Sequence, residues 1–177
     1  ICDDSEGVAI HSLALATYGW MPTMFKQPSF SHLKELKGSI IQLVRGCREG
    51  EASNLVGKIK QPIVANSWVG TSKILHFLNP DVFPIVDSRV AAATRDAFGR
   101  SDFNTPKFYL NLIQFTHARK QDPAVEQLQT AFRDRGLPYK PTGIRCVDLV
   151  LFHRGGKLLD EERERKKAEK ARRSLRV

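Results

Sequence analysis

The sequence predicts an all-α fold, a two-lobed helical domain of about eight short helices. Helical periodicity is the first reason, because most segments between Gly and Pro residues repeat their apolar side chains every three or four positions. Weak strand signals are the second reason: only residues 62–65 and 82–86 form short apolar runs, and prolines interrupt both. A chain of 177 residues is long enough for one domain with its own core.

Local signals mark where the predicted helices begin and end. Pro stands in the first turn of the helices predicted over residues 106–119 and 123–135, where its missing N–H costs nothing. Gly99 closes a helix over residues 88–98, and Gly136 closes the second Pro-initiated helix. The other predicted helices cover residues 8–17, 31–47, 51–59, 72–78 and 143–154.

Two glycines divide the chain into two predicted parts. Gly155 and Gly156 should end the last helix of a single domain over residues 1–156. Residues 157–177 hold nine basic and five acidic side chains, which predicts a charged C-terminal helix or tail whose end frays. A solvated helix is favoured here over a dedicated nucleic-acid arm. Within the domain, we expect residues 8–17, 74–78 and 144–151 to be mostly buried.

Composition indicates a soluble, intracellular protein, either cytoplasmic or nucleoid-associated. The three cysteines Cys2, Cys47 and Cys146 are too widely spaced for a disulfide framework. No apolar run reaches the roughly 18 residues of a membrane span, and the acidic first residues lack the basic segment of a secretory signal. The five histidines have no partners at zinc-ligand spacing, so we predict no metal and no cofactor.

Charge is the strongest signal in the composition. Lys and Arg number 28 against 19 for Asp and Glu, a formal net charge of +9. Such an excess attracts polyanions, above all nucleic acid. A basic solvated surface without a special partner is the alternative at this point.

The start of the helix predicted over residues 72–78 is a candidate anion site. A Gly-containing turn that opens a helix directs unpaired backbone N–H groups outward, where they suit a DNA phosphate. We therefore predict DNA-backbone contacts from Gly70, Thr71 and Ser72, with Arg89 as a further contact. An ordinary Ser or Thr N-cap without a ligand is the alternative.

Asp87 precedes the helix-forming run that begins at Ser88 and should be its N-cap. Backbone N–H donors and the positive end of the helix both favour the charged carboxylate. A fixed carboxylate also stabilises the oxocarbenium character that develops when an N-glycosidic bond breaks. A purely structural cap is the alternative. Lys73, on the preceding helix, is predicted as an amine nucleophile or a phosphate contact, with an ordinary surface lysine as the alternative.

Two stretches, Trp-Val-Gly-Thr-Ser-Lys at residues 68–73 and Phe-Pro-Ile-Val-Asp-Ser-Arg-Val at residues 83–90, resemble the core of the helix-hairpin-helix DNA glycosylases. The 8-oxoguanine glycosylase branch is the most similar, and residues 144–155 resemble the late helix of that fold. The resemblance implies a divergent member in which Asp87 is catalytic. It implies that Lys73 forms a Schiff base, as in the family's bifunctional members, if Lys73 occupies the position of their lysine after the hairpin.

A glycosylase flips its target base out of the duplex, which needs a wedge or stacking partner. Trp20, Trp68 and Tyr18 are the candidates for the wedge or base pocket, and Phe25 is a further one. Each is also a candidate core aromatic.

The sequence thus predicts a monomeric DNA glycosylase that excises a damaged or modified base from duplex DNA and leaves an abasic site. Its role would be DNA repair or defence against modified foreign DNA such as that of a phage. A non-catalytic nucleic-acid-binding helical module is the main alternative. A basic helical adaptor that binds protein through its tail is a third.

Overall fold

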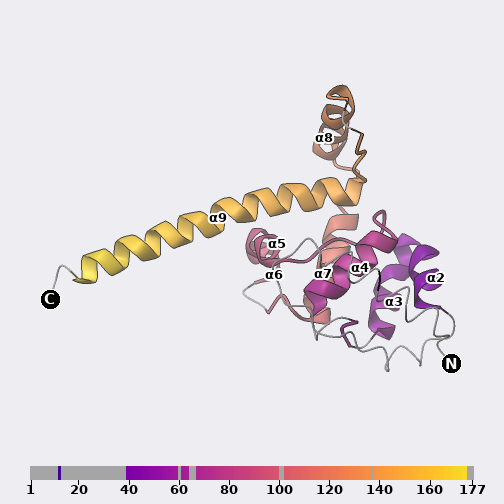
Figure 1. Cartoon of the computed structure of the whole chain (residues 1–177), viewed down its shortest axis with the longest axis horizontal. Helices are drawn as coiled ribbons and strands as arrows, with labels where there is room; N and C mark the ends of the chain where they lie inside the picture. The colour runs from indigo at the N-terminus through magenta and orange to yellow at the C-terminus, as the bar shows by residue number, and fades with distance from the viewer. Residues whose placement is uncertain are drawn as a thin grey trace.

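The computed structural model describes residues 12, 39–59, 61–63, 67–99, 102–136 and 138–174. This part of the chain contains eight α-helices, one 3-10 helix and no strand, so the all-α prediction is confirmed (Figure 1). The predicted helix over residues 8–17 and the aromatic residues Tyr18, Trp20 and Phe25 lie outside the described residues.

Most helix bounds agree with the sequence signals. The N-cap residues Ser39, Thr105 and Asp122 each accept a backbone N–H through their side chain, and a Pro follows the last two. The helix predicted over residues 31–47 covers only Ile40–Arg45 among the described residues. In chain order the elements are α2 (Ile40–Arg45), η2 (Glu49–Glu51), α3 (Ala52–Lys58), α4 (Trp68–Leu78), α5 (Ser88–Ala93), α6 (Arg95–Phe98), α7 (Pro106–His117), α8 (Pro123–Asp134) and α9 (Gly143–Ser174).

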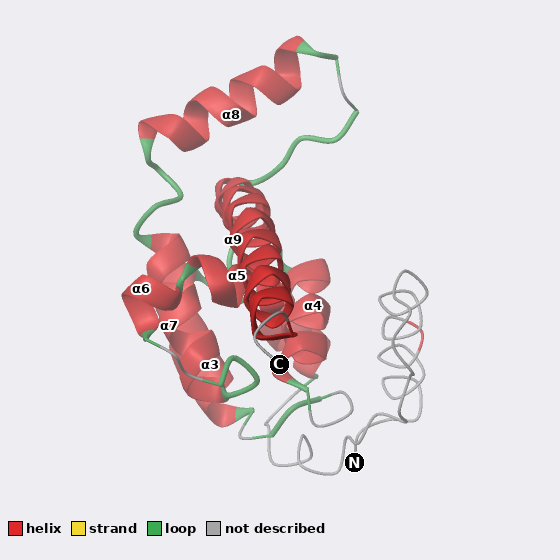
Figure 2. Ribbon diagram, turned by 90° about the vertical axis from the view of Figure 1, so that its left-hand side faces the viewer, coloured by secondary structure: helices red, strands yellow, loops and turns green. Residues whose placement is uncertain are grey.

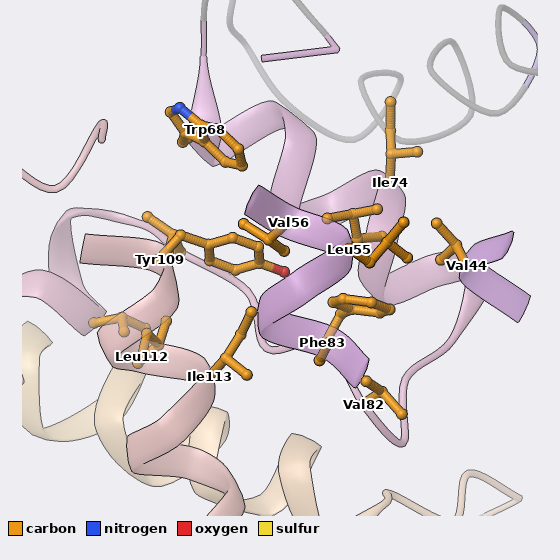
Figure 3. Close-up of a cluster of buried hydrophobic side chains, with 14 of the residues drawn as sticks. Val44, Leu55, Val56, Trp68, Ile74, Val82, Phe83, Tyr109, Leu112 and Ile113 are labelled. Carbon is orange, nitrogen blue, oxygen red and sulfur yellow. The ribbon is translucent and has the colours of Figure 1, made fainter. Parts of the chain in front are cut away.

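The core lies where α3, α4 and α7 meet the segment between α4 and α5 (Figure 3). Phe83, from that segment, is fully buried among side chains of the surrounding helices. Tyr109 of α7 is also fully buried, and its ring lies 5.9 Å from that of Trp68. Large aromatic side chains bury the most apolar surface per residue, so this cluster should contribute most of the hydrophobic stabilisation.

The helix containing residues 72–78 begins earlier than predicted. It starts at Trp68, because Ser67 is the N-cap and its hydroxyl accepts the Gly70 N–H. The cause of the error is burial: Trp68 is only 2% exposed, and its own N–H donates to the side chain of Asn104, 36 residues away. The contact with Asn104 is not visible in the local sequence.

The helix predicted over residues 88–98 is two helices, α5 and α6, which meet at Thr94. The Thr94 hydroxyl donates to the Val90 carbonyl at 2.9 Å and competes there with the helical backbone bond. The predicted end of this segment is confirmed, because Gly99 follows α6 with a positive φ of 73°.

The prediction that Gly155 and Gly156 end the last helix is wrong. Helix α9 continues to Ser174 and extends past the other described helices (Figure 1). Gly in a helix costs about 1 kcal/mol relative to Ala, but here it permits close packing of α9 on α5. Figure 2 looks along α9 and shows α5 beside it. No helix in the described part of the chain is both long enough and apolar enough to cross a membrane.

The burial expected in α4 and α9 is confirmed in part. Ile74, Leu75, Ile144 and Leu151 are buried. Two apolar side chains in the predicted ranges are exposed instead, Phe77 at 57% and Val150 at 54%.

Candidate functional site

Residues 79–87 join α4 to α5 as irregular backbone that passes through the core. Buried backbone N–H and C=O groups need partners, and no helix or sheet supplies them here. Side chains of α4, α7 and α9 supply them instead, as the following contacts show.

Helix α4 holds two peptide groups of this segment. The imidazole of His76 donates from Nδ1 to the carbonyl of Phe83 at 2.7 Å. The hydroxyl of Ser72 accepts the N–H of Val86 at 3.0 Å. Burial lowers the pKa of His76 to about 4, so the ring is neutral at physiological pH. A carbonyl only accepts hydrogen bonds, so the neutral ring carries its proton on Nδ1.

Helix α7 holds two carbonyls of the same segment. The phenol of Tyr109 donates to the Pro84 carbonyl at 3.2 Å, and burial raises its pKa well above the ordinary value. The ring of His117 bonds from Nε2 to the Val82 carbonyl at 2.7 Å. These contacts fix the two residues that flank Phe83.

Helix α9 supplies a further partner through Asp148, which is 1% exposed. Its Oδ2 accepts the Ile85 N–H at 3.0 Å and lies 3.9 Å from the guanidinium of Arg145. Its Oδ1 is buried and makes no hydrogen bond within the described residues. The pKa of Asp148 is raised to about 8, mainly by burial and to a smaller extent by the nearby charge of Asp87, against the opposing effects of the Ile85 N–H and of Arg145. The carboxyl is therefore largely protonated at neutral pH.

Asp87 follows this anchored segment and is the N-cap of α5, as predicted. Its Oδ1 accepts the N–H of Val90 at 2.8 Å, and its backbone is extended. Its Oδ2 makes no hydrogen bond within the described part of the chain. Asp87 thus has one oxygen held by the helix, and the residue as a whole is partly exposed.

Lys73 lies close enough to Asp87 for the two charges to interact. Burial lowers the pKa of the Lys73 amine, and the carboxylate of Asp87 partly opposes this shift. The next residue back along α4 is Ser72, which anchors the peptide before Asp87. The fold therefore brings the two predicted catalytic residues close enough to interact electrostatically, and Asp87 also interacts with Asp148.

The predicted helix start at Gly70, Thr71 and Ser72 is wrong. These residues lie inside α4 and are buried. The Thr71 hydroxyl accepts the Ile63 N–H at 2.8 Å, and the Ser72 hydroxyl also donates to the Val69 carbonyl. Their side chains therefore hold the interior of the protein together.

The other two predicted site residues within the described part lie in different surroundings. Trp68 is a core aromatic, which was the alternative to a wedge. Arg89 is exposed, and its guanidinium lies 4.4 Å from the ring centre of Phe152 on α9, a cation–π contact.

Sequence reasoning missed Asp148 as a member of the site. A signal was present, because this acidic residue shares the otherwise apolar face of α9 with Ile144 and Leu151. A carboxyl on a core-facing stripe needs a buried partner. Which partner it has depends on a segment 63 residues away in sequence.

Comparisons of the chain with models of protein families, with curated proteins and with solved structures found no match.

Proposed function

We propose that this chain is a DNA N-glycosylase that flips out a damaged or modified base and cleaves its N-glycosidic bond. The single observation that carries the proposal is the fixed position of Asp87. Side chains from three helices hold the peptide groups before it, and α5 holds one of its oxygens. The proposal includes a two-lobed arrangement with a helix-hairpin-helix-like element, as the sequence resemblance implies.

In this mechanism Asp87 stabilises the cation that develops on the sugar. As the bond breaks, the base leaves with the bonding electron pair and C1′ becomes electron-poor. A carboxylate that is already fixed stabilises this charge without reorganising, and this type of electrostatic contribution is usually large. Water then adds to C1′ and loses a proton, the departing base takes up a proton, and an abasic site remains.

Lys73 provides a second route from the same intermediate. Its pKa is lowered by burial, which increases the fraction of neutral amine at physiological pH. A neutral amine that attacks C1′ gives, after loss of a proton, a Schiff base with the opened sugar. Lys73 as a phosphate contact is the alternative role.

The test is incubation of the purified chain with a panel of duplexes, each carrying one modified base, with alkali-labile sites as the readout. We expect at least one duplex to be cleaved by the wild type and much less by Asp87→Asn. Binding to DNA without excision of any base would instead favour a non-catalytic nucleic-acid-binding module. Failure to bind DNA would favour a protein-binding adaptor.

A further inference from the structure

A groove runs from the start of α5 along α6, with the outer half of α9 as its other wall. Its volume is about 570 Å³. Ser88, the residue after Asp87, lies at one end, and Arg95 lies further along the same wall. Arg165 and Lys166 of α9 line the opposite wall. The groove therefore reaches the first residue of α5, the chain neighbour of Asp87.

The charges in this groove are unbalanced. Arg95 is paired with Glu162 across the groove. Within the described residues, Arg165 and Lys166 have no ion-pair partner within 4 Å. Their neighbours on α9 differ, because Arg163 is paired with Asp160 and Lys167 with Glu164. Both charges act on the Glu162 carboxylate from beyond ion-pair distance. The groove thus has three positive side chains, Arg95, Arg165 and Lys166, against the single negative charge of Glu162.

We propose that this groove binds the sugar–phosphate backbone of the DNA strand that carries the target nucleotide. The inference rests on the proposed function, since it places this strand next to Asp87. Arginine suits the role because its planar guanidinium donates to two phosphate oxygens at once.

The Arg95–Glu162 pair also fits a phosphate partner. Both side chains are partly exposed, at 35% and 26%, and a partly exposed ion pair contributes little to stability. A phosphate in the groove therefore competes with Glu162 for Arg95. Glu162 should therefore weaken DNA binding, because its ion pair with Arg95 is present before DNA binds.

The first test compares two double variants of α9 with equal loss of charge. Arg165→Gln with Lys166→Gln removes the charges that line the groove, whereas Arg163→Gln with Lys167→Gln removes neighbouring charges outside it. We expect the groove variant to bind an unmodified duplex on the order of tenfold more weakly. The slope of log affinity against log salt concentration should fall by the amount that about two phosphate contacts contribute. The control pair should bind nearly as the wild type does. Equal losses in the two variants would overturn the proposal.

A second variant tests the opposite direction. Glu162→Gln removes the carboxylate that competes with phosphate, so the affinity for the duplex should rise several-fold. A lower affinity in a folded Glu162→Gln protein would contradict the proposal. Competition provides a further check, in which poly-glutamate and a second duplex of equal charge each compete with the bound DNA. If poly-glutamate displaced the DNA as effectively as the second duplex does, the result would overturn the proposal in favour of an acidic protein partner.

These measurements separate the groove from the chemistry. Binding to an unmodified duplex requires no excision, so the groove variants report on the strand contact alone. If only the groove variant lost affinity and no base in the panel was excised, the glycosylase function would be refuted and the groove would remain a DNA-binding site. Excision with equal losses in the two double variants would refute the groove alone.

Discussion

The backbone of Gly155 in α9 packs directly on that of Arg89 in α5. A β-carbon at position 155 would lie 1.7 Å from the Arg89 carbonyl oxygen, far closer than two non-bonded heavy atoms can approach. This contact places α9 across the helix that Asp87 caps. It also brings the ring of Phe152 under the guanidinium of Arg89.

Gly155→Ala should therefore destabilise the protein although Ala is the better helix former. Overpacking costs about 1–3 kcal/mol or more, against about 1 kcal/mol gained from helix propensity. Gly156→Ala is the matched control, since the nearest atom to its β-carbon would be a side-chain carbon of Arg89 at 3.7 Å. We expect the control to be neutral or stabilising in urea unfolding. Equal stability of the two variants would show that the helices separate without cost.

Asp87→Asn should separate capping from catalysis. Asn caps helices nearly as well as Asp, so the free energy of unfolding should fall by no more than about 1 kcal/mol. Excision should slow by on the order of a hundredfold or more, the scale for loss of one preorganised electrostatic group. DNA affinity should hold or rise, because a negative charge near phosphate is removed. A folded variant that excises at the wild-type rate would show that Asp87 is only a cap.

Asp148 should make stability depend on pH. Its pKa is about 8 in the folded protein against an ordinary 3.8, so between these values the folded chain keeps a proton that the unfolded chain loses. This contribution to stability is complete below the unfolded pKa and is lost as the pH rises through about 8, with a slope of up to roughly 1.4 kcal/mol per pH unit. His76, whose pKa falls from 6.5 to about 4, acts in the opposite direction between those values.

The contribution of Asp148 is therefore best resolved between pH 6.5 and 8. In this window wild-type stability should fall with pH relative to Asp148→Asn, which keeps an acceptor for the Ile85 N–H but does not titrate. Chemical denaturation at several pH values measures the difference. Parallel pH profiles for the two proteins would mean that the Asp148 carboxyl is already ionised in the fold.

Lys73 should be trapped on DNA if it is the nucleophile. Borohydride reduces a Schiff base to a stable amine, so a covalent adduct should form with wild type and not with Lys73→Gln. Lys73→Ala should also weaken DNA binding, since it removes a positive charge. Excision without any trapped adduct would define a monofunctional enzyme and leave Lys73 as a phosphate contact.

Local interactions made part of this protein predictable. Asp87 was identifiable as a cap because an N-cap bonds to an amide three residues ahead, and Pro106 marks a helix start because Pro fits the first turn. The all-α fold class follows from periodicity within single segments, which can be seen without knowledge of the fold. Asp87 was therefore assigned to its place without knowledge of the fold.

Tertiary structure decided what depends on distant residues. Gly155 ends a helix by its local propensity, yet α9 continues because the missing β-carbon admits the backbone of Arg89. Asp148 belongs to the site because Ile85, 63 positions earlier, directs its N–H toward that carboxyl. The sequence by itself determined the all-α class, most of the helices and Asp87 as the N-cap of α5. Burial and close approach between separate helices decided how long α9 is, where α4 begins and which side chains hold Asp87 in place, since neither is encoded within a single segment.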